Sequence, residues 1–149
     1  MRNANILALL LPASLLGGAL LSQFAFGLVA CEMCHWQRWP HYAALLPAMV
    51  GIFARHATVK RSMIVLAALL VATSGAIGVF HAVVEYGFWP GLTACTAAPG
   101  GTLADIMNAP ITRCDTPAWT MFGISMAGYN ALISLGGALL LLGLVSRSR

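Results

Sequence analysis

Four long apolar stretches, separated by short polar segments, make up most of this 149-residue chain. They run over about residues 6–30, 36–54, 62–84 and 119–145. Each is close to the roughly 20 residues that a helix needs to cross a hydrocarbon core of about 30 Å. Because a chain in lipid must satisfy its backbone hydrogen bonds internally, the pattern predicts an all-α membrane protein, a four-helix bundle in a single domain.

The composition supports a bilayer as the solvent. Hydrophobic residues make up 60% of the chain and charged residues only 8%, whereas soluble domains are about 25% charged. The few basic residues lie at segment ends, not along one face, which argues against nucleic-acid binding. The first stretch follows Arg2 as in a signal peptide, but it exceeds the about 7–15 apolar residues of such a peptide, so we favour a retained helix.

The charged residues predict the orientation. Six of the eight basic residues fall on one side of the predicted helices: Arg2, Arg55, Lys60, Arg61, Arg147 and Arg149. The other side holds the remaining two basic residues and all four acidic ones: Arg38, Arg113, Glu32, Glu85, Asp105 and Asp115. Since basic residues are retained in the cytoplasm, we expect both termini there and all four cysteines outside.

Two outer segments connect the predicted helices, at about residues 31–35 and 85–118. The longer one is rich in Gly, Pro and Thr, as loops are. Within it, four apolar residues have the spacing of one helix face: Leu103, Ile106, Met107 and Ile111. They predict either a short helix on the membrane surface or a cluster that packs over the helix ends.

The first candidate site is the pair Cys31 and Cys34, which form a C-x-x-C motif at the predicted start of the second helix. This spacing favours a readily exchanged disulfide and a reactive thiolate, and the partial positive charge of a helix N-terminus stabilises an anion there. Arg38 lies one turn beyond Cys34 on the same face. It is placed either to stabilise that thiolate or to donate hydrogen bonds to an oxygen that gains negative charge.

Three other interpretations of this segment stay open. The pair can be a structural disulfide. Zinc can be bound if His35 and His41 join the two cysteines, although the spacing at a helix start is poor for a tetrahedral site, and we predict no metal. Residues 31–35 also spell C-x-x-C-H, the attachment pattern of c-type haem, with Met107 or His81 as a distal ligand.

The second candidate pair is Cys95 and Cys114, which have 18 residues between them in the longer outer segment. A structural bridge here would contribute about 3 kcal/mol by closing the loop. However, small and turn-forming residues surround both cysteines, so we expect them to be accessible and favour exchange chemistry. A pair in a loop and a pair at the lipid edge can pass electrons by thiol–disulfide exchange.

These motifs together resemble the bacterial disulfide bond formation protein B (DsbB) family. The resemblance rests on the predicted topology, on C-x-x-C followed by Gln37 and Arg38 at a helix start, and on the later cysteine pair. The stretches at residues 80–87 and 119–127 also look similar to that family, so the resemblance covers nearly the whole chain.

The resemblance implies a quinone-dependent oxidoreductase in the bacterial inner membrane. Cys95 would form a mixed disulfide with a soluble, periplasmic, thioredoxin-like disulfide oxidase of the DsbA kind. Cys114 would exchange with Cys31. Cys34 would be the thiolate beside ubiquinone or menaquinone, with Arg38 and His81 as quinone-binding residues.

Several details qualify this picture. The spacing between Cys95 and Cys114 is short for the family, which leaves a general or a dedicated soluble partner open. Two interpretations of His81 are equally open: it binds the quinone, or it is simply hydrogen-bonded at the membrane interface. Glu85, four residues further on, can pair with it. Small residues suit close helix contacts, which we expect within one bundle: Ser74, Gly78, Gly123 and Ala127.

Overall fold

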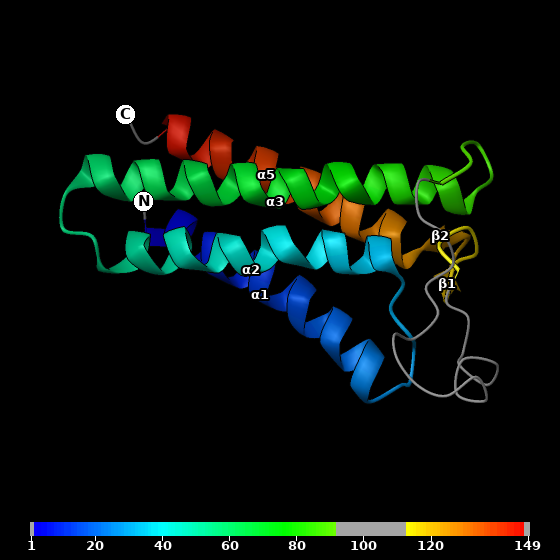
Figure 1. The fold of residues 1–149 in the computed structure, drawn as a ribbon. Coiled ribbons are helices and arrows are strands. Elements are labelled where there is room, and N and C mark those ends of the chain that lie inside the picture. Colours follow the sequence, from blue (N-terminus) through cyan, green and yellow to red (C-terminus); the bar gives the residue numbers. More distant parts are fainter. Residues whose placement is uncertain (1, 92–112, 148–149) are drawn as a thin grey trace.

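The computed structural model describes residues 2–91 and 113–147. Within these ranges the fold consists of helices that lie side by side, together with one small hairpin near the bundle end where α2 begins (Figure 1). α3 packs along both α2 and α5, whereas α1 lies mainly against α2. The elements are α1 (Arg2–Phe24), α2 (Glu32–Phe53), α3 (Ala57–Glu85), β1 (Thr120–Met121), β2 (Ile124–Ser125) and α5 (Met126–Arg147).

Three of the described helices, α1, α3 and α5, are long and apolar enough to cross a membrane. α2 is 22 residues long, but its first half carries five polar or charged side chains: Glu32, His35, Gln37, Arg38 and His41. The structure therefore confirms a helical, multi-pass membrane protein. A fourth span, through α2, stays a prediction.

Two boundaries differ from the sequence prediction at the end of the bundle where α2 begins. α1 ends at Phe24 and not near residue 30, and Gly27, with a φ of +66°, lies in the segment that leads to α2. α2 begins at Glu32, so Cys34 and His35 belong to its first turn and not to a loop. The start of this helix therefore positions the first cysteine pair.

The prediction that the last helix starts near Trp119 is wrong. Strands β1 and β2 pair antiparallel through a two-residue turn, in which Phe122 and Gly123 have φ values of 51° and 77°. Positive φ at both turn residues matches the twist of a hairpin but cannot continue a right-handed helix. The hydroxyl of Tyr86 donates to the Gly123 carbonyl at 2.8 Å and accepts from the Ser125 N–H at 3.1 Å, which ties the hairpin to the end of α3.

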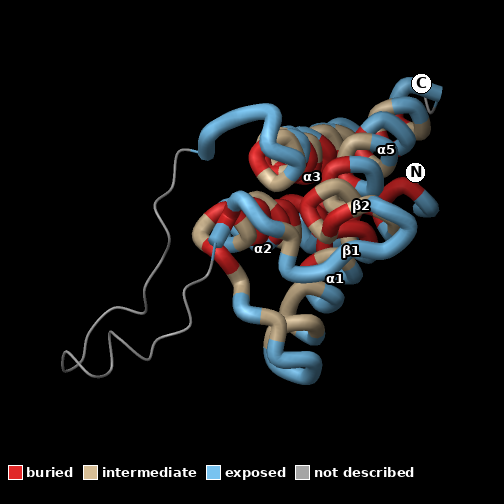
Figure 2. The backbone as a smooth tube through the Cα atoms, turned by 90° about the vertical axis from the view of Figure 1, so that its right-hand side faces the viewer, coloured by how far each residue is buried: buried red, intermediate tan, exposed pale blue. Residues whose placement is uncertain are grey.

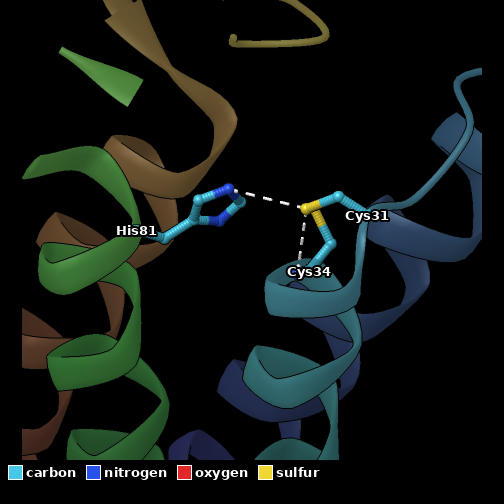
Figure 3. Close-up of side chains that lie close together, drawn as sticks. All are labelled: Cys31, Cys34 and His81. Atoms are coloured by element: carbon cyan, nitrogen blue, oxygen red, sulfur yellow. Dashed lines mark hydrogen bonds between the residues drawn. The ribbon is translucent and has the colours of Figure 1, made fainter. Parts of the chain in front are cut away.

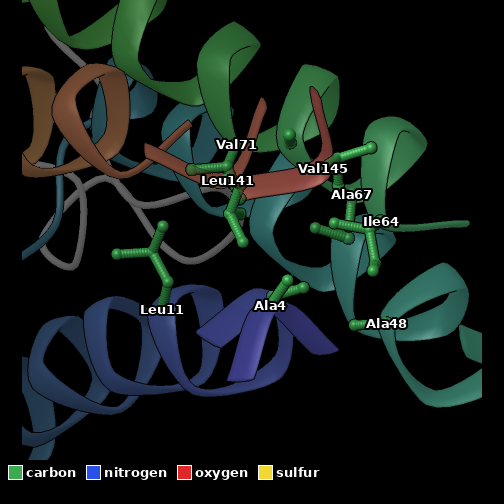
Figure 4. Packing of buried hydrophobic residues seen from close by; sticks show 11 residues of the cluster. Ala4, Leu11, Ala48, Ile64, Ala67, Val71, Leu141 and Val145 are labelled. Atoms are coloured by element: carbon green, nitrogen blue, oxygen red, sulfur yellow. The ribbon is translucent and has the colours of Figure 1, made fainter. Parts of the chain in front are cut away.

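Small and aliphatic side chains pack together in the bundle half where α1 begins and α5 ends (Figure 4). The outward-facing parts of the helices are exposed (Figure 2). Large outward residues such as Phe53, Leu46 and Leu139 are about three-quarters exposed. Helices that are apolar all round suit lipid on the outside. The buried cluster comprises Ala4, Ala8, Leu11, Ala44, Ala48, Ile64, Ala67, Ala68, Val71, Leu141 and Val145.

Close packing of α3 on α5 depends on small residues, as predicted for contacts within one bundle. A Cβ atom added to Gly78 would lie 3.0 Å from the Ala127 carbonyl oxygen and 3.1 Å from the Ala131 nitrogen, both backbone atoms. Ser74, one turn earlier on α3, is fully buried. Gly123 instead serves the hairpin turn.

We expect Gly78→Ala to lower the free energy of unfolding by about 1–3 kcal/mol, because the added methyl group forces the two helix backbones apart. Reversible unfolding in an SDS titration measures this change. Gly136→Ala on α5 is the matched control, since a Cβ there meets nothing within 4 Å. It should leave stability unchanged or raise it by up to about 1 kcal/mol. Equal effects of both changes would contradict the proposed close contact.

Candidate functional site

Cys31 and Cys34 lie together at the start of α2. Cys31 is the N-cap residue, and its sulfur accepts a hydrogen bond from the Cys34 backbone N–H at 3.3 Å. The two sulfur atoms are 3.0 Å apart, so a small movement brings them to bonding distance (Figure 3). The C-x-x-C spacing at a helix start therefore produces a dithiol whose second sulfur lies at the positive end of the helix dipole.

His81 reaches this dithiol from α3, where it is 1% exposed (Figure 3). Its Nε2 lies 3.5 Å from the Cys31 sulfur and 3.6 Å from a carboxylate oxygen of Glu85. The predicted pairing of His81 with Glu85 on one helix face is thus observed. The Cys31 thiol, the His81 ring and the Glu85 carboxyl group can all exchange protons, and they meet in one buried region near the start of α2.

The two thiols differ in character. The hydrogen bond between the two thiol groups and the burial of the sulfur raise the pKa of Cys31 well above its usual range. Cys31 therefore keeps its proton and donates it in the hydrogen bond to the Cys34 sulfur. The Cys34 sulfur accepts this hydrogen bond, which favours negative charge on Cys34 over Cys31.

The side-chain amide of Gln37 links three helices and fixes the tautomer of His81. Its nitrogen donates to the Met33 carbonyl at 3.3 Å and lies 2.7 Å from His81 Nδ1, while its oxygen accepts from the Asn130 amide at 2.8 Å. Because the amide nitrogen is a donor only, Nδ1 of His81 accepts. In the neutral ring Nε2 then carries the proton and directs it toward Cys31 and Glu85.

This polar network continues along the middle of the bundle. The Asn130 amide nitrogen also donates to the Ser74 carbonyl at 3.3 Å. The Asn130 side-chain oxygen accepts from the Ser134 hydroxyl and lies 3.0 Å from His41 Nε2. Buried polar groups in an apolar bundle are costly unless paired, so the network fixes the relative positions of α2, α3 and α5.

Arg38 lines the same site, and its guanidinium is bonded to α1. Its guanidinium donates to the side-chain oxygen of Gln23 and to the Ala19 carbonyl, the latter at 3.2 Å, both on α1. The side chain is buried at 8% exposure. Arg38 therefore holds α1 against α2 beside the dithiol while it supplies a positive charge there.

These residues surround an apolar cavity of about 310 Å³ that opens between α1, α2, α3 and α5. Its walls are mainly apolar and carry a few polar groups, which is the usual composition of a site for a small organic molecule. The side chains that matter for chemistry are Cys31, Cys34, Arg38, His41, His81 and Glu85.

Cys114 lies near this dithiol and is buried at 7% exposure, which corrects the expectation that it is accessible. It packs in one cluster with Cys31, Met33 and Val84. A second hollow of about 460 Å³ is lined by Cys114 together with Trp89 and neighbouring residues. Cys95, and the predicted helix face at residues 103–111, lie outside the described residues.

A metal ion fits this arrangement less well than redox chemistry. Within residues 2–91 and 113–147, one group has ligand atoms mutually within 4.8 Å, namely Cys31, Cys34 and His81. These are three candidate ligands, whereas a structural zinc site has four. His35, a candidate for zinc and haem, is exposed and does not line the cavity.

The sequence analysis named most of the residues at this site but missed the network behind them. Gln37 appeared only as part of a motif, and His41 only as a zinc candidate. Ser74, Asn130 and Ser134 were given no functional role. A signal was present, because polar residues inside membrane-spanning helices mark functional sites by default. The spacing of Asn130 and Ser134 by four residues also places them on one helix face.

A buried dithiol beside an apolar cavity, carried by helices that cross a membrane, defines a membrane-embedded thiol oxidoreductase. The chain belongs to the disulfide bond formation protein DsbB family, whose model matches residues 1–144. The resemblance inferred from the motifs is therefore confirmed, and the protein is an oxidoreductase of disulfide bond formation.

One relative is similar to this chain over most of the length of both proteins. It is Uncharacterized protein RP370 of Rickettsia prowazekii (strain Madrid E), which is 24% identical over 149 residues. The match covers 95% of this chain and 85% of the relative. No solved structure matches the chain.

In the reduced protein we expect iodoacetamide to modify Cys34 before Cys31, because the raised pKa of Cys31 keeps that thiol protonated. An ordinary thiol becomes reactive as the pH rises through about 8.5, whereas Cys31 labelling should stay low across pH 7–9. Mass spectrometry of peptides after timed labelling measures both sites. Denatured protein, in which the two thiols should react alike, is the control. Faster labelling of Cys31 in the folded protein would contradict this assignment.

Proposed function

We propose that this protein is a thiol:quinone oxidoreductase that re-oxidises a soluble, thioredoxin-like disulfide oxidase and passes the electrons to ubiquinone or menaquinone. The observation that carries the proposal is the position of the Cys31–Cys34 dithiol on the wall of an apolar cavity between membrane helices. A lipid-soluble acceptor can enter such a cavity from the bilayer. Membership of the DsbB family supports the same reaction class.

The cavity fits a quinone head group by size and chemistry. Its volume of about 310 Å³ lies at the lower end of the range for small-molecule sites. A quinone is a flat apolar ring with two carbonyl oxygens, which accept hydrogen bonds. The described wall offers donors in the Arg38 guanidinium, which has five N–H groups and uses two of its nitrogens to bond α1. The Nε2–H of His81, which points toward Cys31 and Glu85, lies on the same wall.

The electrons and protons balance across this site. Oxidation of the dithiol to the Cys31–Cys34 disulfide releases two electrons and two protons, and a bound quinone takes up both to become a quinol. Cys34 supplies the reactive sulfur, since the hydrogen bond from Cys31 and the helix N-terminus favour its negative charge. The positive charge of Arg38 stabilises negative charge that develops next to it.

The second cysteine pair supplies the electrons in this proposal. The packing of Cys114 against Cys31 supports exchange between these two residues. Cys95 forms the mixed disulfide with the soluble partner. Electrons then pass from the partner to Cys95 and Cys114, next to Cys31 and Cys34, and finally to the quinone, through successive thiol–disulfide exchanges.

The proposed location is the bacterial inner membrane, with both termini in the cytoplasm and the cysteines in the periplasm. The start of α1 and the end of α5 lie at one end of the bundle, and α2 begins at the opposite end (Figure 1). Five basic residues of the described chain lie toward that common end: Arg2, Arg55, Lys60, Arg61 and Arg147. Because α2 runs from one end to the other beside α3, we propose that it also spans the bilayer, with its polar half buried against α3 and α5.

With a reduced thioredoxin-like disulfide oxidase as the electron donor, we expect Cys34→Ser and Cys95→Ser each to abolish the reduction of ubiquinone. The loss of ubiquinone absorbance measures the reaction in detergent. With dithiothreitol as the donor, Cys95→Ser should retain activity, because a small dithiol can reduce the Cys31–Cys34 disulfide directly.

Thr73→Ala is the control, since Thr73 is exposed on α3 and its hydroxyl bonds to the Leu69 carbonyl of the same helix. It should keep activity with both donors. Full activity of Cys34→Ser with either donor would overturn the proposed function.

A further inference from the structure

The hairpin at residues 120–125 has no part in the proposed electron path, yet it contributes to the cavity. Met121 on β1 and Trp119, which directly precedes β1, are both cavity-lining residues. They are 44% and 42% exposed, so each has surface that a bound molecule can cover. The hairpin therefore adds largely apolar surface to the cavity that the Cys31–Cys34 dithiol also lines.

The hairpin is too small to keep this position by itself. Each strand has two residues, and an isolated two-stranded hairpin is marginally stable at best. The turn also holds Phe122 at a φ of 51°, a conformation that bulky side chains rarely adopt. The location of the hairpin beside the cavity therefore depends on contacts with the helices.

Two tyrosine hydroxyl groups provide such contacts from two different helices. Tyr86, the C-cap residue of α3, donates to the Gly123 carbonyl at 2.8 Å and accepts from the Ser125 N–H at 3.1 Å. Tyr129, in the first turn of α5, donates to the Met121 carbonyl at 3.0 Å. The first tyrosine therefore holds the turn and β2, and the second holds β1.

The two tyrosines differ in their relation to the cavity. Tyr129 lines it, and its ring centroid lies 6.4 Å from that of Trp119, so Tyr129 can also touch a bound molecule. Tyr86 does not line the described cavity, and its hydroxyl bonds to the hairpin. An effect of the Tyr86 hydroxyl on a molecule in the cavity must therefore pass through the hairpin.

We propose that the hairpin forms a wall of the quinone site, with Met121 and Trp119 packed against the bound ring. Aromatic and thioether side chains pack well against flat rings. The hydroxyl groups of Tyr86 and Tyr129 hold this wall in place, and Tyr86 is a positioning residue because it acts through the hairpin. The inference rests on the proposed function, since it concerns the same bound molecule.

The first test measures quinone binding to the oxidised full chain in detergent, in which no thiols can pass electrons to the ligand. Calorimetry gives the dissociation constant of decylubiquinone. Tyr86→Phe and Tyr129→Phe each remove a hydroxyl group and keep the ring. One hydrogen bond changes an equilibrium constant by up to about tenfold, so we expect each variant to weaken binding about three- to fivefold.

Tyr42→Phe is the matched control for the loss of a hydroxyl group. Tyr42 is exposed on α2, where its ring contacts Trp39, and it does not line the described cavity. Because it lies away from the hairpin contacts, binding should stay within about twofold of the unmodified protein.

A second pair of variants tests the wall itself. Met121→Ala removes a cavity-lining side chain, and we expect it to weaken binding about fivefold or more through lost apolar contact. Phe122→Ala changes the neighbouring residue, which is 91% exposed and does not line the described cavity. It should leave binding within about twofold. Thermal unfolding checks that every variant is folded.

Steady-state kinetics distinguish positioning of the ligand from a general structural role. With dithiothreitol as the donor, Tyr86→Phe should raise KM for ubiquinone and keep kcat at saturating quinone, because the dithiol itself is unchanged. A general structural role would instead lower kcat and thermal stability without a selective rise in KM.

The outcomes separate this inference from the function on which it rests. If the unmodified protein does not bind decylubiquinone, the proposed function and the inference fail together. If it binds, and either Met121→Ala or Tyr86→Phe leaves the affinity unchanged, only the inference is overturned. Equal losses in the two controls would also overturn it. Weaker binding in both hydroxyl variants and in Met121→Ala, with the controls unaffected, supports it.

Discussion

The side-chain amide of Gln37 is the contact on which the rest of the site depends. It joins α2 to His81 on α3 and to Asn130 on α5, and every polar atom of the amide has a partner. Because an amide has a distinct donor and acceptor end, these contacts set the direction of the hydrogen bonds around them. The neutral tautomer of His81 follows from this one group.

This polar interior also explains the composition of α2, which is the least apolar of the long helices. Its N-terminal half carries the dithiol, the amide, the guanidinium and a histidine, and each of these side chains meets a partner or the cavity. Large apolar residues are exposed on the other faces of the helices, which suit contact with lipid. In the proposed fourth span, the helix that carries the chemistry would be stabilised by its neighbours and not by its own hydrophobicity.

Sequence patterns predicted the helices, their order and the dithiol, since apolar length and the C-x-x-C spacing are local signals. They failed where the local structure or the burial of a residue depends on a contact between segments that are distant in the sequence. The hairpin at residues 120–125 is tied by Tyr86 from the end of α3, so its apolar residues were predicted as the start of a helix. The burial of Cys114 depends on packing against Met33 and Val84, which its glycine- and proline-rich surroundings do not reveal. His81 was named as a candidate, but its approach to Cys31 from 50 residues away is a tertiary contact.

The central claim is that the Cys31–Cys34 dithiol delivers its electrons directly to a quinone in the adjoining cavity. A single-turnover reaction tests this claim most directly, with a Cys95→Ser, Cys114→Ser protein that contains only this dithiol. The protein is reduced, freed of reductant and mixed anaerobically with excess ubiquinone, without a soluble partner. The account predicts about one quinol per protein molecule, matched by the loss of both thiols, and none when Cys34→Ser is added. Unchanged ubiquinone together with two intact thiols would contradict it.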